Sequence, residues 1–186
     1  SPGIAGAIKM IVGLIPAHNE GEGIAASVAS LAAQVDEVIV ISDNSSDDTV
    51  ACAEAAGAIV IESVDNEDKK AGALNQTLTA LLDLGPSPFD LPVLADSDYV
   101  LEMDADSRID EGFVARALEE FKLTPDAGAV GGIFLGDPGG FLCLTSLFGQ
   151  TGFFGLVGGE LVDDVGGFDQ CLGQRAGSGG RHVCID

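Results

Sequence analysis

"MIVGLIP", Met10 to Pro16, is the stretch of sequence that decides the fold. It is a short apolar run that stops at a proline, which is the pattern of a strand buried on both faces. Directly after it, apolar residues recur at helical spacing, at Ile24, Val28, Leu31 and Val35. A buried strand followed by an amphipathic helix is the repeating unit of parallel sheets, so this stretch predicts an α/β protein.

The same alternation of strand and helix continues to residue 134. Further strands are expected at Glu37–Ser42, Ala58–Glu62, Tyr99–Met103 and 127–134. Helices are expected through Ala56, over Ala71–Leu81 and over Phe113–Phe121. This order predicts a doubly wound, mostly parallel sheet that is flanked by helices and joined by right-handed crossovers.

Composition bounds the class of protein and its partners. The chain has 186 residues, of which 46% are hydrophobic and 20% charged, so we expect one folded domain rather than disorder. Its net charge is −22, from 30 acidic residues against 8 basic ones. Such a surface repels nucleic-acid phosphates and anionic lipids, so no nucleic-acid partner is expected and membrane contact is not favoured. Adaptation to high salt is an alternative source of this acidity.

Cysteine and histidine usage favours a cytoplasmic protein with reduced thiols. No C-x-x-C spacing occurs among the cysteines, which are Cys52, Cys143, Cys171 and Cys184. This favours free thiols over a zinc site. The two histidines, His18 and His182, are too few for a His-based metal cage.

The ends of the predicted strands carry most of the chemical signal. In an open α/β sheet, ligands bind beyond the carboxyl ends of the strands. Acidic residues follow three of these ends: Glu20 in "PAHNE", Asp43 in "SDNSSDD", and Asp104 and Asp106 in "DADS". If the strands are parallel, these carboxylates meet at one edge of the sheet, where clustered oxygens suit Mg²⁺ or Mn²⁺.

The D-x-D step is the sharpest of these signals. An apolar run, Val100 to Met103, ends abruptly in Asp104 and Asp106. We expect the pair to bind a divalent metal, because carboxylates brought together in a tight step beyond a buried strand repel one another unless a cation neutralises them. The alternative is a solvated turn in which Asp106 or Asp110 caps the next helix.

Asp43 follows the second strand, where dinucleotide-binding folds place an acid against a ribose. The alternative is an Asx-turn with the following "NSS". A nicotinamide oxidoreductase would also need G-x-G-x-x-G after the first strand, and the chain has "IPAHNEGEG" there. The P-loop pattern is absent as well, so both of these classes are disfavoured.

Four ordered motifs together resemble the nucleotide-sugar-binding half of a family 2 glycosyltransferase with the GT-A fold. They are "IPAHNEGEGIAASVASLAAQ", "EVIVISDNSSDDTV", "KKAGALNQTL" and "YVLEMDADSRID". The resemblance implies that a nucleotide is bound by Pro16, Ala17, Glu20, Asp43, Lys70 and Asp104. It also implies that Asp104 and Asp106 carry the metal on the diphosphate. For Lys70, a solvated lysine at a helix start is the alternative.

The resemblance implies a metal-dependent, inverting glycosyltransferase that uses a nucleotide-diphospho-sugar such as a UDP-sugar, with Mn²⁺ or Mg²⁺. Residues 10–134 would form the donor half of the single domain 1–186, and residues 135–186 part of the acceptor half. The sugar, the nucleobase, the acceptor and the oligomeric state stay open.

The acceptor half departs from the family pattern. "VGGFD", Val165 to Asp169, is present, but no Glu-Asp pair follows it. The candidates for the base that deprotonates the acceptor are Asp164, Asp169 and Asp186, or a residue beyond this sequence. The uncharged, glycine-rich stretch 138–159 is expected to be a partly buried segment that closes over a pocket, with membrane-surface contact as the alternative.

Two other functions stay open, the first because of these departures and the second because it also uses acidic residues and a metal on a nucleotide. One is a truncated or degenerate relative that binds a nucleotide without transferring sugar. The other is a nucleotidyltransferase, although such enzymes open with a glycine- and arginine-rich phosphate loop, and "IPAHNEGEG" contains no arginine.

Overall fold

The computed structural model describes residues 9–95, 97–124, 127–132, 146–149 and 181–185. These residues form one sheet of seven strands in the order β3-β2-β1-β4-β6-β5-β7. The strands are β1 (Ile11–Ala17), β2 (Glu37–Ser42), β3 (Ile59–Glu62), β4 (Tyr99–Glu102), β5 (Ala127–Gly132), β6 (Ser146–Gly149) and β7 (Arg181–Ile185).

Most of the strand pairs are parallel. β1 pairs in parallel with β2 and with β4, β2 pairs in parallel with β3, and β5 pairs in parallel with β7. β6 is antiparallel to both β4 and β5. The prediction of a mostly parallel sheet is therefore confirmed.

β6 corrects one expectation. Ser146–Gly149 lies inside the uncharged stretch 138–159, which we expected to close over a pocket, yet these four residues form a strand between β4 and β5. An apolar run without charges can be buried inside a sheet as readily as over a ligand, and the pattern alone does not separate the two. The rest of that stretch lies outside the described residues.

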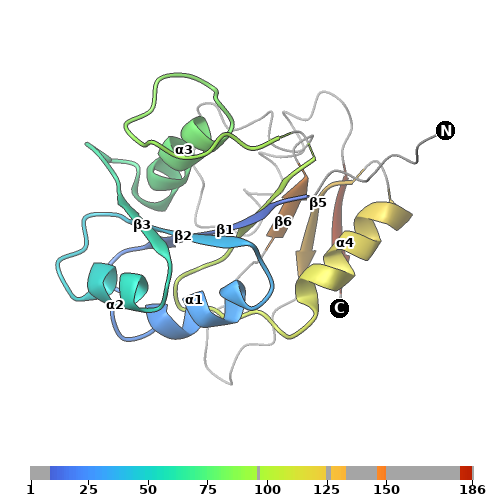
Figure 1. Cartoon of the computed structure of the whole chain (residues 1–186), viewed down its shortest axis with the longest axis horizontal. Coiled ribbons are helices and arrows are strands. Elements are labelled where there is room, and N and C mark those ends of the chain that lie inside the picture. Colours follow the sequence, from blue (N-terminus) through green and yellow to red (C-terminus); the bar gives the residue numbers. More distant parts are fainter. Residues whose placement is uncertain (1–8, 96, 125–126, 133–145, 150–180, 186) are drawn as a thin grey trace.

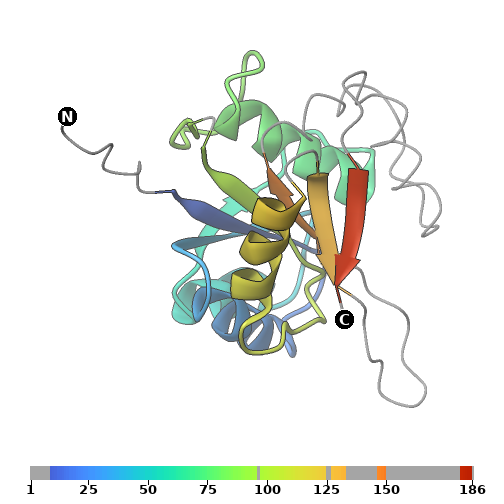
Figure 2. The same ribbon diagram turned by 90° about the vertical axis from the view of Figure 1, so that its right-hand side faces the viewer.

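Helices cover both faces of the sheet. α1 (Ile24–Ala32), α2 (Thr49–Ala55) and α4 (Phe113–Leu123) pack on one face, and α3 (Lys69–Leu81) packs on the other, as Figure 1 shows. In Figure 2, α4 crosses in front of the sheet beside β5 and β7. The doubly wound arrangement that the sequence predicts is confirmed.

β1 supplies both faces of the core. Ile11 and Ile15 point into the cluster with α1 and α4, whereas Val12 and Leu14 point into the cluster with α3. All seven residues of β1 are buried, which explains why its sequence is continuously apolar rather than alternating.

The starts of α2 and α4 are held in different ways. Asp47 accepts a hydrogen bond from the Thr49 backbone N–H at 3.0 Å, so it does serve the start of α2. α4 begins at Phe113 after Gly112, which has a left-handed φ of 80°. Asp110 contributes only its backbone carbonyl, which accepts from the Phe113 N–H at 3.1 Å, so the expectation of a side-chain cap from Asp110 was wrong.

Among the described residues, every helix is too short or too polar to traverse a bilayer. The division of the domain into a donor half and an acceptor half near residue 134 stays a prediction.

Candidate functional site

The carboxyl ends of β1, β2 and β4 lie at the same edge of the sheet because these strands are parallel neighbours. Ala17 is opposite Ser42, and Leu14 is opposite Glu102. We call the loops that follow, residues 18–23, 43–48 and 103–107, the carboxyl edge. The predicted acids Glu20, Asp43, Asp104 and Asp106 all lie on these loops, directly after strands that are hydrogen-bonded to one another.

The loop after β1 is tied to the loop after β2. Asn19 adopts a left-handed φ of 56°, which asparagine tolerates better than most residues, and its Oδ1 accepts from the Ser46 N–H at 2.8 Å. The Glu20 N–H donates to Thr49 Oγ1 at 2.8 Å. Pro16 and Ala17 end β1 at this point, and the Ala17 carbonyl accepts from the Asp43 N–H at 2.8 Å. The two loops therefore form one rigid unit.

Asp43 is a buried carboxylate held by three neutral donors. It is 8% exposed, and its Oδ1 accepts from Ser63 Oγ at 2.6 Å, Asn66 Nδ2 at 2.8 Å and Asn44 Nδ2 at 3.0 Å. Its side chain makes no Asx-turn bond to the "NSS" backbone in the described structure. Oδ2 receives no hydrogen bond from the described residues, which leaves one oxygen of an oriented carboxylate for a ligand.

Asn66 links Asp43 to the start of α3. Its Nδ2 also donates to the Lys69 carbonyl at 2.7 Å, and its Oδ1 accepts from the Asp68 N–H at 3.1 Å. Gly72 makes this position possible, because a Cβ at Gly72 would lie 1.8 Å from Asn66 Oδ1. One amide side chain thus connects the acid after β2 with the helix that carries Lys70.

The D-x-D step forms a tight turn that is anchored to α1. The Ser107 N–H donates to the Asp104 carbonyl at 3.1 Å, and Ser27 Oγ donates to the Ala105 carbonyl at 2.6 Å. Ala105 is 5% exposed, while the Asp104 side chain is 33% exposed and Asp106 is exposed. The buried middle residue and the anchored carbonyl fix the backbone, and both acids reach solvent.

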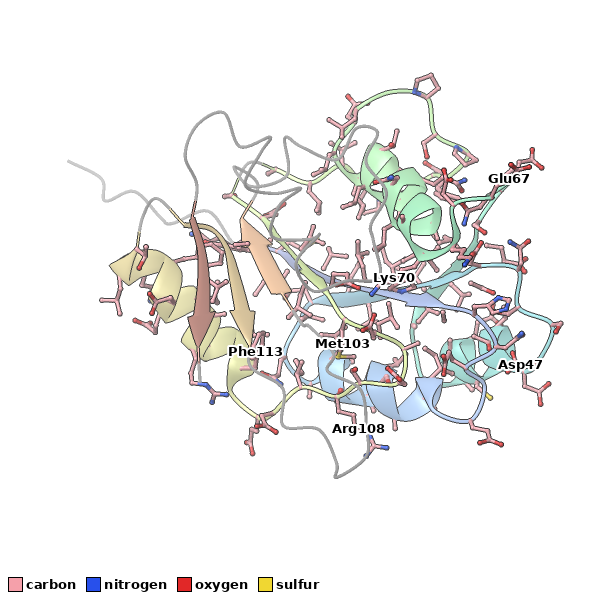
Figure 3. The ribbon with its side chains drawn as sticks, turned by 180° about the vertical axis from the view of Figure 1, so that it is seen from behind. Asp47, Glu67, Lys70, Met103, Arg108 and Phe113 are labelled. Atoms are coloured by element: carbon pink, nitrogen blue, oxygen red, sulfur yellow. The ribbon has the colours of Figure 1, made fainter. Side chains whose placement is uncertain are left out.

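Lys70 pairs with two acids, while its side chain stays 44% exposed. Its Nζ contacts Asp104 Oδ1 and lies 2.8 Å from Glu102 Oε1. Figure 3 shows Lys70 between α3 and the sheet, whereas Glu67, in the connection before α3, points outward. Burial alone would lower the pKa of Lys70, but the carboxylates of Glu102 and Asp104 outweigh it and raise this pKa above its usual value. The ammonium therefore stays protonated at neutral pH.

Glu102 is the inner acid of this group. Its side chain is 10% exposed, and no hydrogen bond of ordinary geometry from the described residues reaches its Oε1, so the Lys70 ammonium acts on it as an ion-pair partner. Burial raises the pKa of Glu102, Lys70 opposes that effect, and Asp104 adds to it. Sequence reasoning missed this residue, because the apolar run Val100 to Met103 was interpreted without the charge it contains.

Glu20 shows that the acids converge. Burial raises its pKa first, and the negative charges of Asp106, Asp47 and Asp104 raise it further. Such mutual repulsion requires that the acids after β1, β2 and β4 lie near one another. Glu20, Asp104 and Asp106 of the predicted set are therefore near one another, Asp43 is not among the charges that act on Glu20, and the roles of all four acids in binding stay predictions.

The residues of the carboxyl edge fit a hard divalent cation. Within the described part of the chain, no group of three or more His, Cys, Asp or Glu side chains is arranged to hold a metal by itself. Mg²⁺-type sites, however, usually take one or two carboxylates and complete their shell with phosphate oxygens and water. Asp104 and Asp106, both solvent-reaching acids on one anchored turn, supply that smaller set.

The three candidates for the catalytic base, Asp164, Asp169 and Asp186, lie outside the described residues. Their role stays a prediction. Sequence reasoning also missed Ser63 and Asn66, whose only local signal is the polar connection "SVDNEDKK" between β3 and α3.

Comparisons with known proteins relate this edge of the sheet to a family and to solved structures. Residues 14–81 match the model of the family described as Glycosyl transferase family 2. The resemblance to family 2 glycosyltransferases is confirmed. The matched residues run from β1 to the end of α3, so they contain Glu20, Asp43 and Lys70 and end before the D-x-D turn. No curated protein matches the chain.

Solved structures share the fold. The glucosyl-3-phosphoglycerate synthase of Mycobacterium tuberculosis has a TM-score of 0.63 at 20% identity over 96% of this chain and 71% of its own. The same enzyme in complex with Mg²⁺ and uridine-diphosphate has a TM-score of 0.51 at 26% identity over 68% of this chain and 44% of its own. A structure described as a mycobacterial protein has a TM-score of 0.54 at 26% identity over 72% of this chain and 43% of its own.

The chain thus spans less than half the length of two of these structures. Their architecture confirms the GT-A-like α/β fold class that the sequence predicts.

Proposed function

We propose that this chain is a metal-dependent glycosyltransferase that takes its sugar from a nucleotide-diphospho-sugar, with UDP-sugars as the first donors to test. The observation that carries the proposal is the carboxyl edge: an oriented buried acid after β2, two solvent-reaching acids after β4, and Lys70 beside them. A similar structure at 26% identity, a glucosyl-3-phosphoglycerate synthase, is in complex with Mg²⁺ and uridine-diphosphate, which supports the choice of UDP.

Each group at this edge has a task in the proposal. Asp43 offers Oδ2 to an N–H or O–H of the nucleoside, since Oδ1 is already occupied by three donors. Pro16 and Ala17 are the last two residues of β1 beside it, and Glu20 lies in the loop that follows. A divalent ion on Asp104 and Asp106 would neutralise charge that develops on the leaving diphosphate. Lys70 places a second positive charge at the same point.

Transfer with inversion also needs a base for the acceptor hydroxyl, and Asp164, Asp169 and Asp186 are the candidates that we propose to test first. The acceptor itself is not part of the proposal.

Binding of UDP and GDP by calorimetry, with and without Mn²⁺, tests the donor site. We expect metal-dependent binding by the wild type and its loss in Asp104→Ala/Asp106→Ala, by about tenfold or more, since each charged contact contributes roughly 1.5–3 kcal/mol. Glu54→Ala/Glu119→Ala is the matched control, because it removes two exposed acids from α2 and α4, away from the carboxyl edge. Equal, metal-independent binding by all three proteins would contradict the proposal.

Turnover separates the enzyme from a binding module. Hydrolysis of a UDP-sugar, or its transfer to a supplied acceptor, supports the glycosyltransferase. Tight, metal-dependent UDP binding without any turnover favours a nucleotide-binding relative without transfer activity. Release of diphosphate from a nucleoside triphosphate in the presence of a sugar phosphate would instead indicate a nucleotidyltransferase.

A further inference from the structure

Glu102 is a charged residue at a position where the fold calls for an apolar one. It ends β4, which has β1 on one side and β6 on the other, and its Cα partners are Leu14 and Ser146. Two residues earlier on the same face of β4, Val100 packs into the apolar cluster under α3. A carboxylate in such a place is costly unless a cation accompanies it, so its presence needs an explanation.

Lys70 is the cation that accompanies it. The ammonium lies between an inner acid, Glu102, whose side chain is 10% exposed, and an outer acid, Asp104, whose side chain is 33% exposed. The Lys70 side chain itself is 44% exposed, so its charge also reaches solvent at the carboxyl edge. Of these two partners, only Asp104 belongs to the proposed metal site.

The two acids differ in what a bound metal and diphosphate would do to them. Asp104 would bind the cation, and its ion pair with Lys70 would become weaker. Glu102 is more buried than Asp104, and its ion pair with Lys70 would remain. A long lysine side chain without a fixed partner samples many rotamers, and that freedom reduces the strength of any contact that it makes with a ligand.

The backbone beside Lys70 is also held in an unusual conformation. Lys69 has a left-handed φ of 50°, which is rare for a lysine, and its carbonyl accepts from Asn66 Nδ2 at 2.7 Å. Asn66 thus holds the peptide group that precedes Lys70, and Glu102 pairs with the ammonium at the far end of the Lys70 side chain. A side chain that is held at both ends is built to keep one position.

We propose that Glu102 is a positioning residue that holds the Lys70 ammonium at the diphosphate subsite after the metal has taken Asp104. The inference rests on the proposed function, because it assigns a task to Lys70 in donor binding. Glu102 itself does not touch the donor.

The sign of one substitution separates this role from a simple charge effect. Glu102→Gln keeps the shape of the side chain and removes a negative charge near an anionic ligand. If Glu102 acted on the ligand only through its charge, the substitution would tighten UDP binding, because like charges repel. If Glu102 holds Lys70, the same substitution weakens UDP binding.

The experiment is a double-mutant cycle on UDP binding, measured by calorimetry at an Mn²⁺ concentration that saturates each protein. The four proteins are the wild type, Glu102→Gln, Lys70→Met and Lys70→Met/Glu102→Gln. We expect Glu102→Gln to weaken UDP binding about fivefold and Lys70→Met about tenfold or more, since contacts of a charged group are involved. In the Lys70→Met background, Glu102→Gln should have no effect or tighten binding slightly.

Two controls accompany the cycle. Glu119→Gln breaks the exposed Glu119–Lys122 pair on α4 and should leave UDP binding unchanged. Thermal unfolding checks that each variant folds, and the double variant is the safeguard here, because Lys70→Met alone leaves Glu102 buried without its cation, whereas the double variant does not.

The outcomes are distinct. Tighter or unchanged UDP binding by Glu102→Gln overturns the inference, as does an equal loss in both backgrounds, which would indicate a structural role. If the wild type itself does not bind UDP with Mn²⁺, the proposed function fails, and that result is read from the wild type alone.

Discussion

The acids after β2 and after β4 lie at the same edge of the sheet but are held in different ways. Asp43 has three neutral donors on one oxygen, all of them from side chains. Asp104 and Glu102 share one ammonium, that of Lys70. The neutral donors on Asp43 orient its carboxylate without cancelling its charge, and they include no cation that an incoming metal ion could replace. A lysine cancels charge, and a divalent cation can replace it.

This difference divides the carboxyl edge into a rigid part and an exchangeable part. In the proposed function, the rigid part around Asp43 would recognise the nucleoside, which depends on the direction of hydrogen bonds. The exchangeable part around Asp104 would hold the metal and diphosphate, whose arrival and departure change the number of charges. The predictions below test this division.

The largest effect is expected at Asp43. Asp43→Asn replaces a buried acceptor of three hydrogen bonds by an amide, and should lower the free energy of unfolding by about 2–3 kcal/mol. Asp104→Asn should cost less than about 1 kcal/mol, because its contact with Lys70 is solvent-exposed and the substitution also relieves repulsion among the acids. Urea unfolding of the two variants measures this, and equal losses would remove the distinction between the two parts.

A substitution at Gly72 tests the rigid part through Asn66, which donates to Asp43. Helix propensity alone predicts that Gly72→Ala stabilises α3 by about 1 kcal/mol. The new Cβ would lie 1.8 Å from Asn66 Oδ1, so we expect a net loss of about 1–2 kcal/mol from overpacking instead.

Asn66→Ala supplies the control for this prediction. In that background the collision with Asn66 is gone and only the tighter contact with Asp68 Cβ, at 3.0 Å, remains, so Gly72→Ala should cost clearly less in the same unfolding measurement. A loss of the same size in both backgrounds would mean that Asn66 is not what Gly72 accommodates.

The smallest effect is expected from metal alone. Mg²⁺ at about ten times its dissociation constant should add about 1.4 kcal/mol of stability through binding to the folded state. Asp104→Ala/Asp106→Ala should lose this gain, and Asp43→Asn should keep it, because Asp43 lies in the rigid part. Thermal unfolding with and without Mg²⁺ measures all three proteins, and a gain that disappears in Asp43→Asn instead would place the cation after β2.

Much of the fold could be predicted from residues 10–124, because each strand and helix there carries its own apolar period. β1 is apolar throughout since both of its faces are covered, and the helical spacing from Ile24 to Leu31 matches the buried face of α1. β6 could not be predicted in the same way. Its four residues lie in a long uncharged stretch whose pattern fits several environments, and the pairing with β4 and β5 decides among them.

In the candidate site, too, some features could be predicted from local sequence and others could not. The acids after the strands could be predicted, because parallel strands bring their carboxyl ends to one edge whatever their loops contain. The partners of those acids could not. Lys70 and Asp104 are 34 residues apart, and Asn66 and Asp43 are 23 apart, and no local pattern relates side chains over such distances.

The sequence by itself determined the alternation of strand and helix and the placement of acids at strand ends, since both depend on the chemistry of neighbouring residues. Only the tertiary structure decided that Glu102 faces Lys70 and that three neutral donors surround Asp43, because burial and charge pairing arise when distant segments pack together. The physical reason is that apolar periodicity is a local property, whereas the environment of a carboxylate is set by every segment that packs around it.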